Sequence, residues 1–115
     1  MGAGTQISWD DFSKVDIRTG IIIKAERFPE ARNPAYKLYI DFGNELGMLR
    51  SSAQITDLYL PEQLEGMQIV AVVNLPPKQI GPFMSECLVL GPVSGGGEVT
   101  LLQTERKTKK GLRIS

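Results

Sequence analysis

The chain has 115 residues, of which 42% are hydrophobic and 23% charged, so it can form one domain and is too short for two. Histidine is absent, which excludes the commonest general base, the commonest metal ligand and every Ser-His or Cys-His nucleophile pair. A single cysteine, Cys87, excludes an intramolecular disulfide framework and favours a reducing compartment.

The start of the chain predicts a leader without fixed structure. Residues 1–6 are small or polar and show no periodicity, so we expect a disordered leader over 1–7 and one domain over 8–115. The leader has no basic region followed by an apolar one, and the longest apolar run, Ile69 to Val73, is too short to cross a membrane. We therefore expect a cytoplasmic protein without membrane insertion.

The next segments predict a short helix and three strands. Ser8 followed by acidic residues favours a capped helix from Trp9 to about Lys14. Alternation from Ile17 to Glu26 predicts a long half-buried strand, in which Gly20 marks a bend or a close backbone approach. Its buried face is expected to hold Ile17, Thr19, Ile21, Ile23 and Ala25. Two further strands are predicted over Tyr36–Phe42, with Tyr36, Leu38, Ile40 and Phe42 inward, and over Met48–Ile55.

The second half of the chain predicts one more helix and three more strands. Pro61 and Gly66 fit the start and the end of a short helix. Strands are expected over 68–75, 83–90 and, after the glycines at 95–97, over 99–103. The pattern is typical of an all-β fold, a five-stranded Greek-key barrel of the OB type with short flanking helices.

No motif for catalysis or for a cofactor is found in this sequence. The glycine run at 95–97 is not followed by the Lys and Ser or Thr of a phosphate loop, so a hairpin turn is expected there. Cys87 has no basic neighbour in sequence and alternates with apolar residues, which favours a buried or half-buried thiol. We expect a binding protein, not an enzyme, with no metal and no cofactor.

Polar residues interrupt the apolar strands at positions where an OB barrel gathers its ligand-facing groups. They can equally well face water. The four candidate residues on one strand are Arg50, Ser51, Ser52 and Gln54, and those around another strand are Asn74, Lys78, Ser85 and Glu86. Four aromatic residues could stack on bases, namely Phe28, Tyr36, Tyr39 and Phe83, although a core position fits Tyr36 better, as it does Phe42.

Both ends of the chain suggest contacts outside the barrel. Residues 103–115 hold five basic side chains against one acidic one, so this tail is either a solvated end or a contact for nucleic acid. Leu112 and Ile114 resemble a terminal strand that needs a partner, which could be another subunit. Trp9 and Phe12 lie on a helix too short to persist alone. We therefore predict a symmetric homodimer that involves these four residues.

Four separated blocks make the sequence similar to a known family. They are residues 12–20, residues 50–56 followed by 70–77, and residues 85–91. Over residues 11 to about 103 the chain resembles the tRNA-binding domain of methionyl-tRNA synthetase extensions, and in particular the free-standing CsaA branch. The resemblance implies an OB fold, a homodimer, tRNA binding and a chaperone role in protein export, with unfolded preproteins and the export machinery as further partners.

The resemblance also assigns an RNA-binding face by position. That face is expected to hold Lys37, Arg50, Ser51, Ser52, Gln54, Asn74, Lys78, Ser85 and Glu86. Thr19, Cys87 and the tail residues 108–111 differ from the usual family pattern, whereas residues 111–114 fit the usual ending.

Polypeptide binding is the alternative to RNA binding. The body of the chain is acidic, which opposes phosphate contacts, and apolar residues near the same face would suit a peptide. These residues are Phe28, Pro76, Pro77 and Phe83. The tRNA or the client protein that is recognised stays open.

Overall fold

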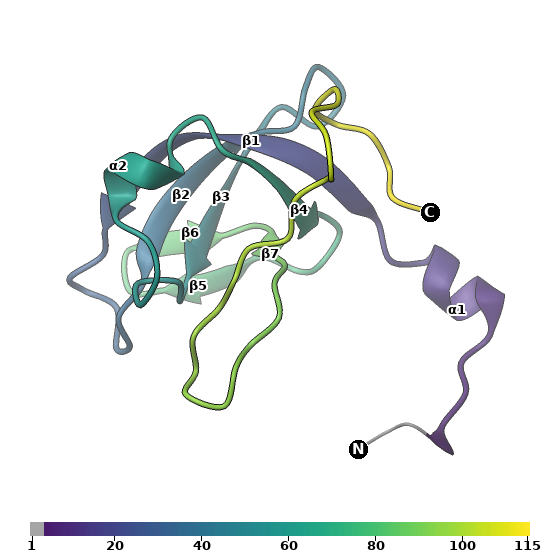
Figure 1. The fold of residues 1–115 in the computed structure, drawn as a ribbon, viewed down its shortest axis with the longest axis horizontal. Helices are drawn as coiled ribbons and strands as arrows, with labels where there is room; N and C mark the ends of the chain where they lie inside the picture. Colours follow the sequence, from purple (N-terminus) through teal and green to yellow (C-terminus); the bar gives the residue numbers. More distant parts are fainter. Residues whose placement is uncertain (1–3) are drawn as a thin grey trace.

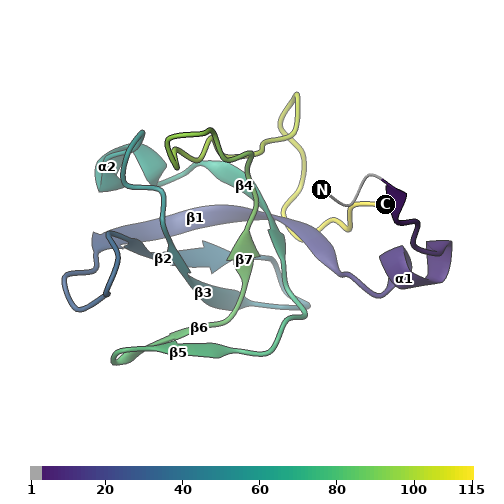
Figure 2. The ribbon, with the colours of Figure 1, turned by 90° about the horizontal axis from the view of Figure 1, so that it is seen from below.

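The computed structural model describes residues 4–115, which form seven strands and two short helices (Figures 1 and 2). Of the predicted leader, residues 1–3 lie outside the described residues, and residues 4–7 are exposed. In chain order the elements are α1 (Trp9–Ser13), β1 (Ile17–Arg27), β2 (Tyr36–Asp41), β3 (Met48–Ala53), α2 (Pro61–Leu64), β4 (Gln68–Val72), β5 (Lys78–Ile80), β6 (Phe83–Ser85) and β7 (Leu88–Val89).

A five-stranded antiparallel sheet in the order β3-β2-β1-β4-β7 curls into a nearly closed barrel. Its two end strands, β3 and β7, meet without a backbone ladder between them. Side-chain and loop contacts close this seam: the Ser51 hydroxyl donates to the Cys87 carbonyl at 2.9 Å, and the Glu86 N–H donates to the Arg50 carbonyl at 2.7 Å. The predicted OB-type barrel is confirmed.

The long strand β1 belongs to both halves of the barrel. Its first half pairs with β4 and its second half with β2, so the strand must bend between the two halves of the barrel. Gly20 lies at this bend, where a Cβ atom would come within 2.7 Å of the Phe42 ring, so the predicted close approach is confirmed. The predicted inward positions of Ile21 and Ile23 are wrong, because Gly20 and Ile22 face the core in this part of the strand and Ile23 is 50% exposed. A bulge between Ile22 and Lys24 then shifts the alternation, so that Ala25 is buried as predicted.

The core lies between β1, β2, β3 and β4. The predicted inward face of β2 is confirmed, since Tyr36, Leu38, Ile40 and Phe42 are all buried. Helix α2 begins at Pro61 and places Leu64, which is fully buried, in the same core. The short helix α1 has the predicted cap, in which the Ser8 hydroxyl accepts from Asp11 N–H at 3.0 Å, but none of its residues is buried.

Two strand predictions in the second half of the chain are wrong. The predicted strand over 83–90 is divided at residues 86 and 87, with β6 pairing to β5 in a separate hairpin and β7 pairing to β4. Residues 99–103 form no strand: Val99 makes an isolated bridge with Val93, and the N–H groups of Thr100 and Leu102 donate to the carbonyls of Pro92 and Leu90 at 3.1 and 3.0 Å. Within residues 4–115, neither helix has the length that crossing a membrane requires.

The C-terminal tail pairs with β1 of its own chain, on the edge opposite β4. The N–H groups of Gly111 and Ile114 donate to the carbonyls of Thr19 and Ile17 at 2.7 and 2.8 Å. The Thr19 hydroxyl donates to the Lys109 carbonyl at 2.7 Å and accepts from Leu112 N–H at 3.0 Å. The terminal segment predicted to need a partner thus pairs with a strand of its own chain, and Thr19 anchors the tail there.

Candidate functional site

The side of the β1-β2-β3 sheet that faces away from the core carries a row of polar and charged side chains. Along β2, Lys37 and Tyr39 alternate with the buried residues, and their partners on β3 are Ser52 and Arg50. On β1, Lys24 and Glu26 lie next to Tyr39 and Lys37. We call this surface the outer face, and it consists of Lys24, Glu26, Lys37, Tyr39, Arg50 and Ser52.

A second, small apolar cluster lies next to the outer face. Phe28 and Phe83 are only 4% and 5% exposed, and their ring centroids lie 5.4 Å apart at an edge-on angle. Tyr39 adds a third ring, 6.2 Å from Phe83. The apolar patch expected near Phe28 and Phe83 is thus covered, because the β5-β6 hairpin and the 28–35 loop pack against each other there. In this structure, neither ring offers a free surface to a base or a peptide.

Cations cover these rings. The Lys37 ammonium lies 5.4 Å from the centroid of Phe28 and 5.9 Å from that of Phe83, and the Arg50 guanidinium lies 5.5 Å from Phe83. The Lys24 ammonium lies 5.6 Å from the Tyr39 ring. An aromatic face attracts such a cation electrostatically, so the rings hold these three side chains against the sheet.

Two carboxylates balance part of this charge. Glu26 pairs with Lys24 at 3.0 Å, and this hydrogen bond lowers the pKa of Glu26 and raises that of Lys24. Glu86 accepts from both the backbone N–H and the side-chain Nε of Arg50, at 2.9 and 3.3 Å. Lys37 forms no ion pair within residues 4–115. The outer face therefore has more positive than negative groups, although the body of the chain is acidic.

Several of the sequence-predicted residues line one hollow beside the outer face. It has a volume of about 290 Å³ and lies between the end of β3, the β5-β6 hairpin and the approach to β7. In it, the Ser85 hydroxyl accepts from the Ser52 N–H at 3.0 Å. The predicted residues in its lining are Ser52, Gln54, Pro76, Lys78, Ser85 and Glu86. Pro77 is exposed but lies outside this lining.

Two predicted binding residues hold the fold together. Ser51 is 1% exposed and donates its hydroxyl hydrogen bond across the barrel seam, so its side chain does not face a ligand. Asn74 accepts from Asp16 N–H at 2.9 Å and donates to the Lys14 carbonyl at 2.6 Å, which fixes the connection between α1 and β1. Cys87 is buried as predicted, and burial is the main reason why its pKa rises to about 12.

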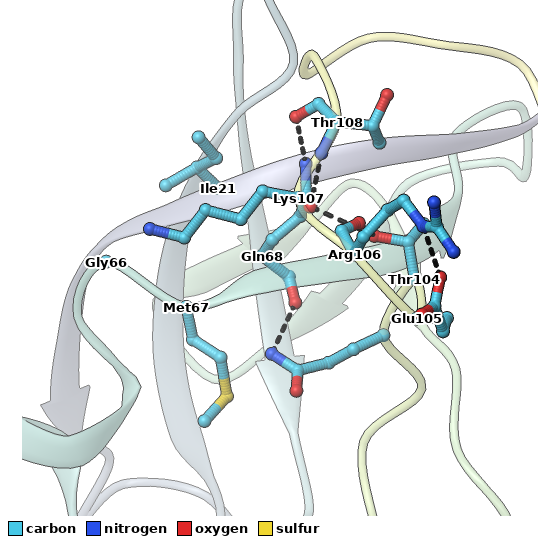
Figure 3. A pocket seen from close by; sticks show the side chains of 10 residues that line it. Ile21, Gly66, Met67, Gln68, Thr104, Glu105, Arg106, Lys107 and Thr108 are labelled. Atoms are coloured by element: carbon cyan, nitrogen blue, oxygen red, sulfur yellow. Dashed lines mark hydrogen bonds and ion pairs between the residues drawn. The ribbon is translucent and has the colours of Figure 1, made fainter.

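Sequence reasoning missed Lys24 and Glu26 as part of the outer face. Their alternation within β1 was visible, but the bulge at Ile23 decides which side they occupy, and nothing in the local sequence marks that bulge. It also missed Gln68 as a second residue, besides Thr19, that holds the tail. Its side chain donates to the Thr108 carbonyl at 2.7 Å and accepts from the Thr104 hydroxyl at 3.1 Å, inside the hollow drawn in Figure 3.

A separate apolar groove lies at the chain ends. Helix α1 projects away from the barrel on the same side as the C-terminus in both views (Figures 1 and 2). Between them is a groove of about 520 Å³, whose lining includes Trp9, Phe12 and Ile114. Trp9 is 91% exposed, Phe12 41% and Leu112 44%, so all four residues predicted for the dimer contact lie in this region and three of them face solvent.

Comparison with known proteins identifies the family. Residues 17–113 match the family described as "Putative tRNA binding domain". The chaperone CsaA of Bacillus anthracis is 53% identical, with a TM-score of 0.91 over 96% of this chain and 100% of that one. The CsaA chaperone protein of Picrophilus torridus is 50% identical, with a TM-score of 0.89 and the same shares of the two chains.

A more distant relative links the fold to the synthetases. The methionyl-tRNA-synthetase-related protein of Pyrococcus horikoshii is 30% identical, with a TM-score of 0.85 over 96% of this chain and 99% of that one. With the family match over most of the chain and the CsaA structures matched over their full length, the chain belongs to the tRNA-binding-domain family, in its CsaA-like branch.

Proposed function

We propose that this protein binds tRNA through the outer face and the neighbouring hollow. The observation that carries the proposal is the pair of cations, Lys37 and Arg50, held over the Phe83 ring on a chain with no net charge. Phosphate contacts dominate the affinity of proteins for nucleic acid, so a local positive surface can bind RNA even where the whole molecule offers no attraction.

Fluorescence anisotropy with labelled tRNA and a labelled DNA duplex, repeated across a salt series, tests this proposal. We expect tRNA to bind more tightly, because its folded backbone and unpaired loops offer groups that a DNA duplex does not. Equal affinities for the two ligands at every salt concentration would contradict it, since attraction by charge alone would then explain the binding.

We further propose a homodimer built from the exposed groove between α1 and the C-terminal tail. Three apolar side chains in this region are exposed, namely Trp9, Phe12 and Leu112, and α1 buries none of its own residues. Ile114 lines the groove between them. A second copy would cover this surface and place two outer faces on one particle, which raises the affinity for a ligand long enough to reach both.

A chaperone role is the second candidate, and a specific surface favours it. Both CsaA relatives are described as chaperones. A groove of about 350 Å³ follows the seam between β3 and β7, and its lining includes the exposed side chains of Leu88 and Val93. Unfolded polypeptide offers apolar side chains and unpaired backbone groups to such a seam. As the specific partners of such a chaperone, we propose preproteins and the export machinery.

Aggregation assays with a denatured client protein separate the two functions. Val93→Ser removes an apolar side chain that is 65% exposed and lines the seam groove but not the hollow proposed for tRNA, and it leaves the charges of the outer face in place. For a chaperone, we expect this variant to lose suppression of aggregation while its tRNA affinity stays the same. Suppression equal to that of the unchanged protein would exclude the seam groove as the polypeptide site.

A further inference from the structure

Phe28, Tyr39 and Phe83 form the aromatic cluster beside the outer face, and two ways of binding RNA there make opposite use of them. In the first way, bases stack on exposed rings. In the second, the rings face inward and support charged groups that contact the backbone. Burial and geometry distinguish the two ways.

The two phenylalanine rings have no room for a base. Phe28 and Phe83 are almost fully buried, and the Lys37 and Arg50 side chains lie over them at 5.4 to 5.9 Å. A base could stack on Phe83 only after both cations had moved away, which would cost the attraction between the cations and the ring. The positions where bases would stack are thus already occupied by the chain's own positive groups.

Arg50 is held in a fixed orientation from two sides. Its Nε donates to Glu86 at 3.3 Å, and its guanidinium lies over Phe83. No hydrogen bond from its two terminal nitrogens to a residue within 4–115 is found, and its side chain is 43% exposed. A planar group oriented in this way presents two parallel donors, a geometry that matches the oxygens of a phosphate.

We propose that Phe83 is a positioning residue that holds Lys37 and Arg50 as a phosphate-binding pair for the RNA backbone. This proposal rests on the proposed tRNA binding and adds the chemical group that is recognised: phosphate, with the bases left unstacked. RNA would then be selected by the shape of its backbone at this face and not by its base sequence.

Three probes test the proposal: inorganic phosphate, and two single-stranded oligoribonucleotides of equal length, one with bases and one abasic. NMR titration with inorganic phosphate should shift the side-chain signals of Arg50 and Lys37 before those of Lys107, an exposed cation of the tail that, like Lys37, forms no ion pair within residues 4–115. The two oligonucleotides should bind within about twofold of each other. A ligand held by stacking would instead lose at least about fivefold in affinity for each base removed.

Variants test the role of the ring. Phe83→Leu keeps an apolar side chain and removes the aromatic face, and we expect it to weaken binding of the abasic oligonucleotide roughly threefold to tenfold. Phe42→Leu is the control, because it makes the same change in the main core, where no cation of residues 4–115 lies over the ring. If Phe83→Leu does not fold, Arg50→Lys takes its place, since it keeps the charge and loses the planar fork; we then expect a similar loss with an unchanged salt dependence.

The outcomes separate this inference from the function on which it rests. If tRNA does not bind but phosphate shifts Arg50 and Lys37, the tRNA proposal is wrong and the phosphate pair stands. If tRNA binds but the abasic oligonucleotide binds much more weakly, or Phe83→Leu and Phe42→Leu behave alike, the positioning role of Phe83 is overturned. Where Phe83→Leu does not fold, Arg50→Lys is tested instead. If this variant binds the abasic oligonucleotide as tightly as the unchanged protein, the proposed role of the oriented Arg50 guanidinium is overturned.

Discussion

The two aromatic clusters of this molecule have opposite surroundings. Phe28 and Phe83 pack against each other under Lys37 and Arg50 and are almost fully buried. Trp9 and Phe12 extend from a five-residue helix that buries none of its residues. The chain covers the first cluster with its own cations and leaves the second uncovered. In the first region an aromatic ring supports charged groups, and in the second it is available to another surface.

The difference shows that aromatic residues near a binding surface can have different roles in one small domain. Covering apolar area is worth about 25 cal/mol per Å², so an exposed tryptophan gains stabilisation only when another surface covers it. A buried ring below a lysine and an arginine has already gained that stabilisation and also fixes the two cations. Substitutions in the two regions should therefore change different properties.

The largest expected effect is on stability in the covered cluster. Phe83→Ser removes a buried ring and leaves a polar group in a cavity, so we expect the free energy of unfolding to fall by about 3 to 5 kcal/mol. Chemical denaturation at low protein concentration measures it. Trp9→Ser is the matched change in the uncovered region and should alter monomer stability by less than about 0.5 kcal/mol. Similar losses for the two variants would contradict the distinction.

The next effect concerns association. If Trp9 lies in a dimer contact, Trp9→Ala should weaken the dimer by about 2 kcal/mol or more, about a 30-fold change in its dissociation constant. Sedimentation over a dilution series measures this constant, starting from the expected dimer of twice 12.7 kDa. A protein that sediments as a monomer before any substitution would show that the uncovered cluster serves another partner.

A smaller effect tests how the tail supports the uncovered region. Thr19→Val keeps the shape of the side chain but removes the hydroxyl that bonds Lys109 and Leu112. The free energy of unfolding should fall by about 1 to 3 kcal/mol, because the Leu112 N–H loses its acceptor. Hydrogen exchange should become faster in residues 109–114 and stay unchanged in β2 and β3. Unchanged exchange in the tail would mean that its backbone pairing alone holds it.

The smallest effect is a pH dependence of the same tail. The hydrogen bond from Lys110, at 2.7 Å, and one from the Gly43 N–H lower the pKa of Asp41 below its ordinary value of 3.8. A carboxyl with a lowered pKa stabilises the folded state above that ordinary value and loses the effect as the pH falls through the folded value.

Asp41→Asn keeps the bond to Gly43 and removes the charge, so it should cost less than about 1 kcal/mol near neutral pH. Denaturation of the two proteins across pH measures the difference, which should shrink below pH 3.8. A difference that is constant with pH would show that the ion pair does not stabilise the fold.

The sequence predicted the regular parts of the fold well. Alternation defined β2 and its buried face, and Gly20 and Pro61 marked a bend and a helix start that the structure contains. The β5-β6 hairpin was missed because its strands have only three residues each, too few for a period to emerge. The bulge at Ile23 was missed because it depends on pairing with β2.

The candidate site was predicted only in part, for the same reason. Ser52, Lys78 and Ser85 were found because they interrupt apolar strands, and they do line one hollow. The same pattern selected Ser51, which turned out to be buried at the barrel seam. Polar residues that bind ligands and polar residues that close a barrel look alike until tertiary contacts are known. The burial of Phe28 and Phe83 below cations likewise depends on contacts between distant segments.

The most direct test of the central claim compares two double variants that change the net charge equally. Lys37→Gln with Arg50→Gln alters the outer face, and Arg106→Gln with Lys107→Gln alters the tail. The slope of log affinity for tRNA against log salt concentration is measured for both. We predict that the outer-face variant lowers the slope by about 1.4 to 1.8, from two lost phosphate contacts, while the tail variant changes it much less. Equal changes in the two variants, or a larger change for the tail, would contradict RNA binding at the outer face.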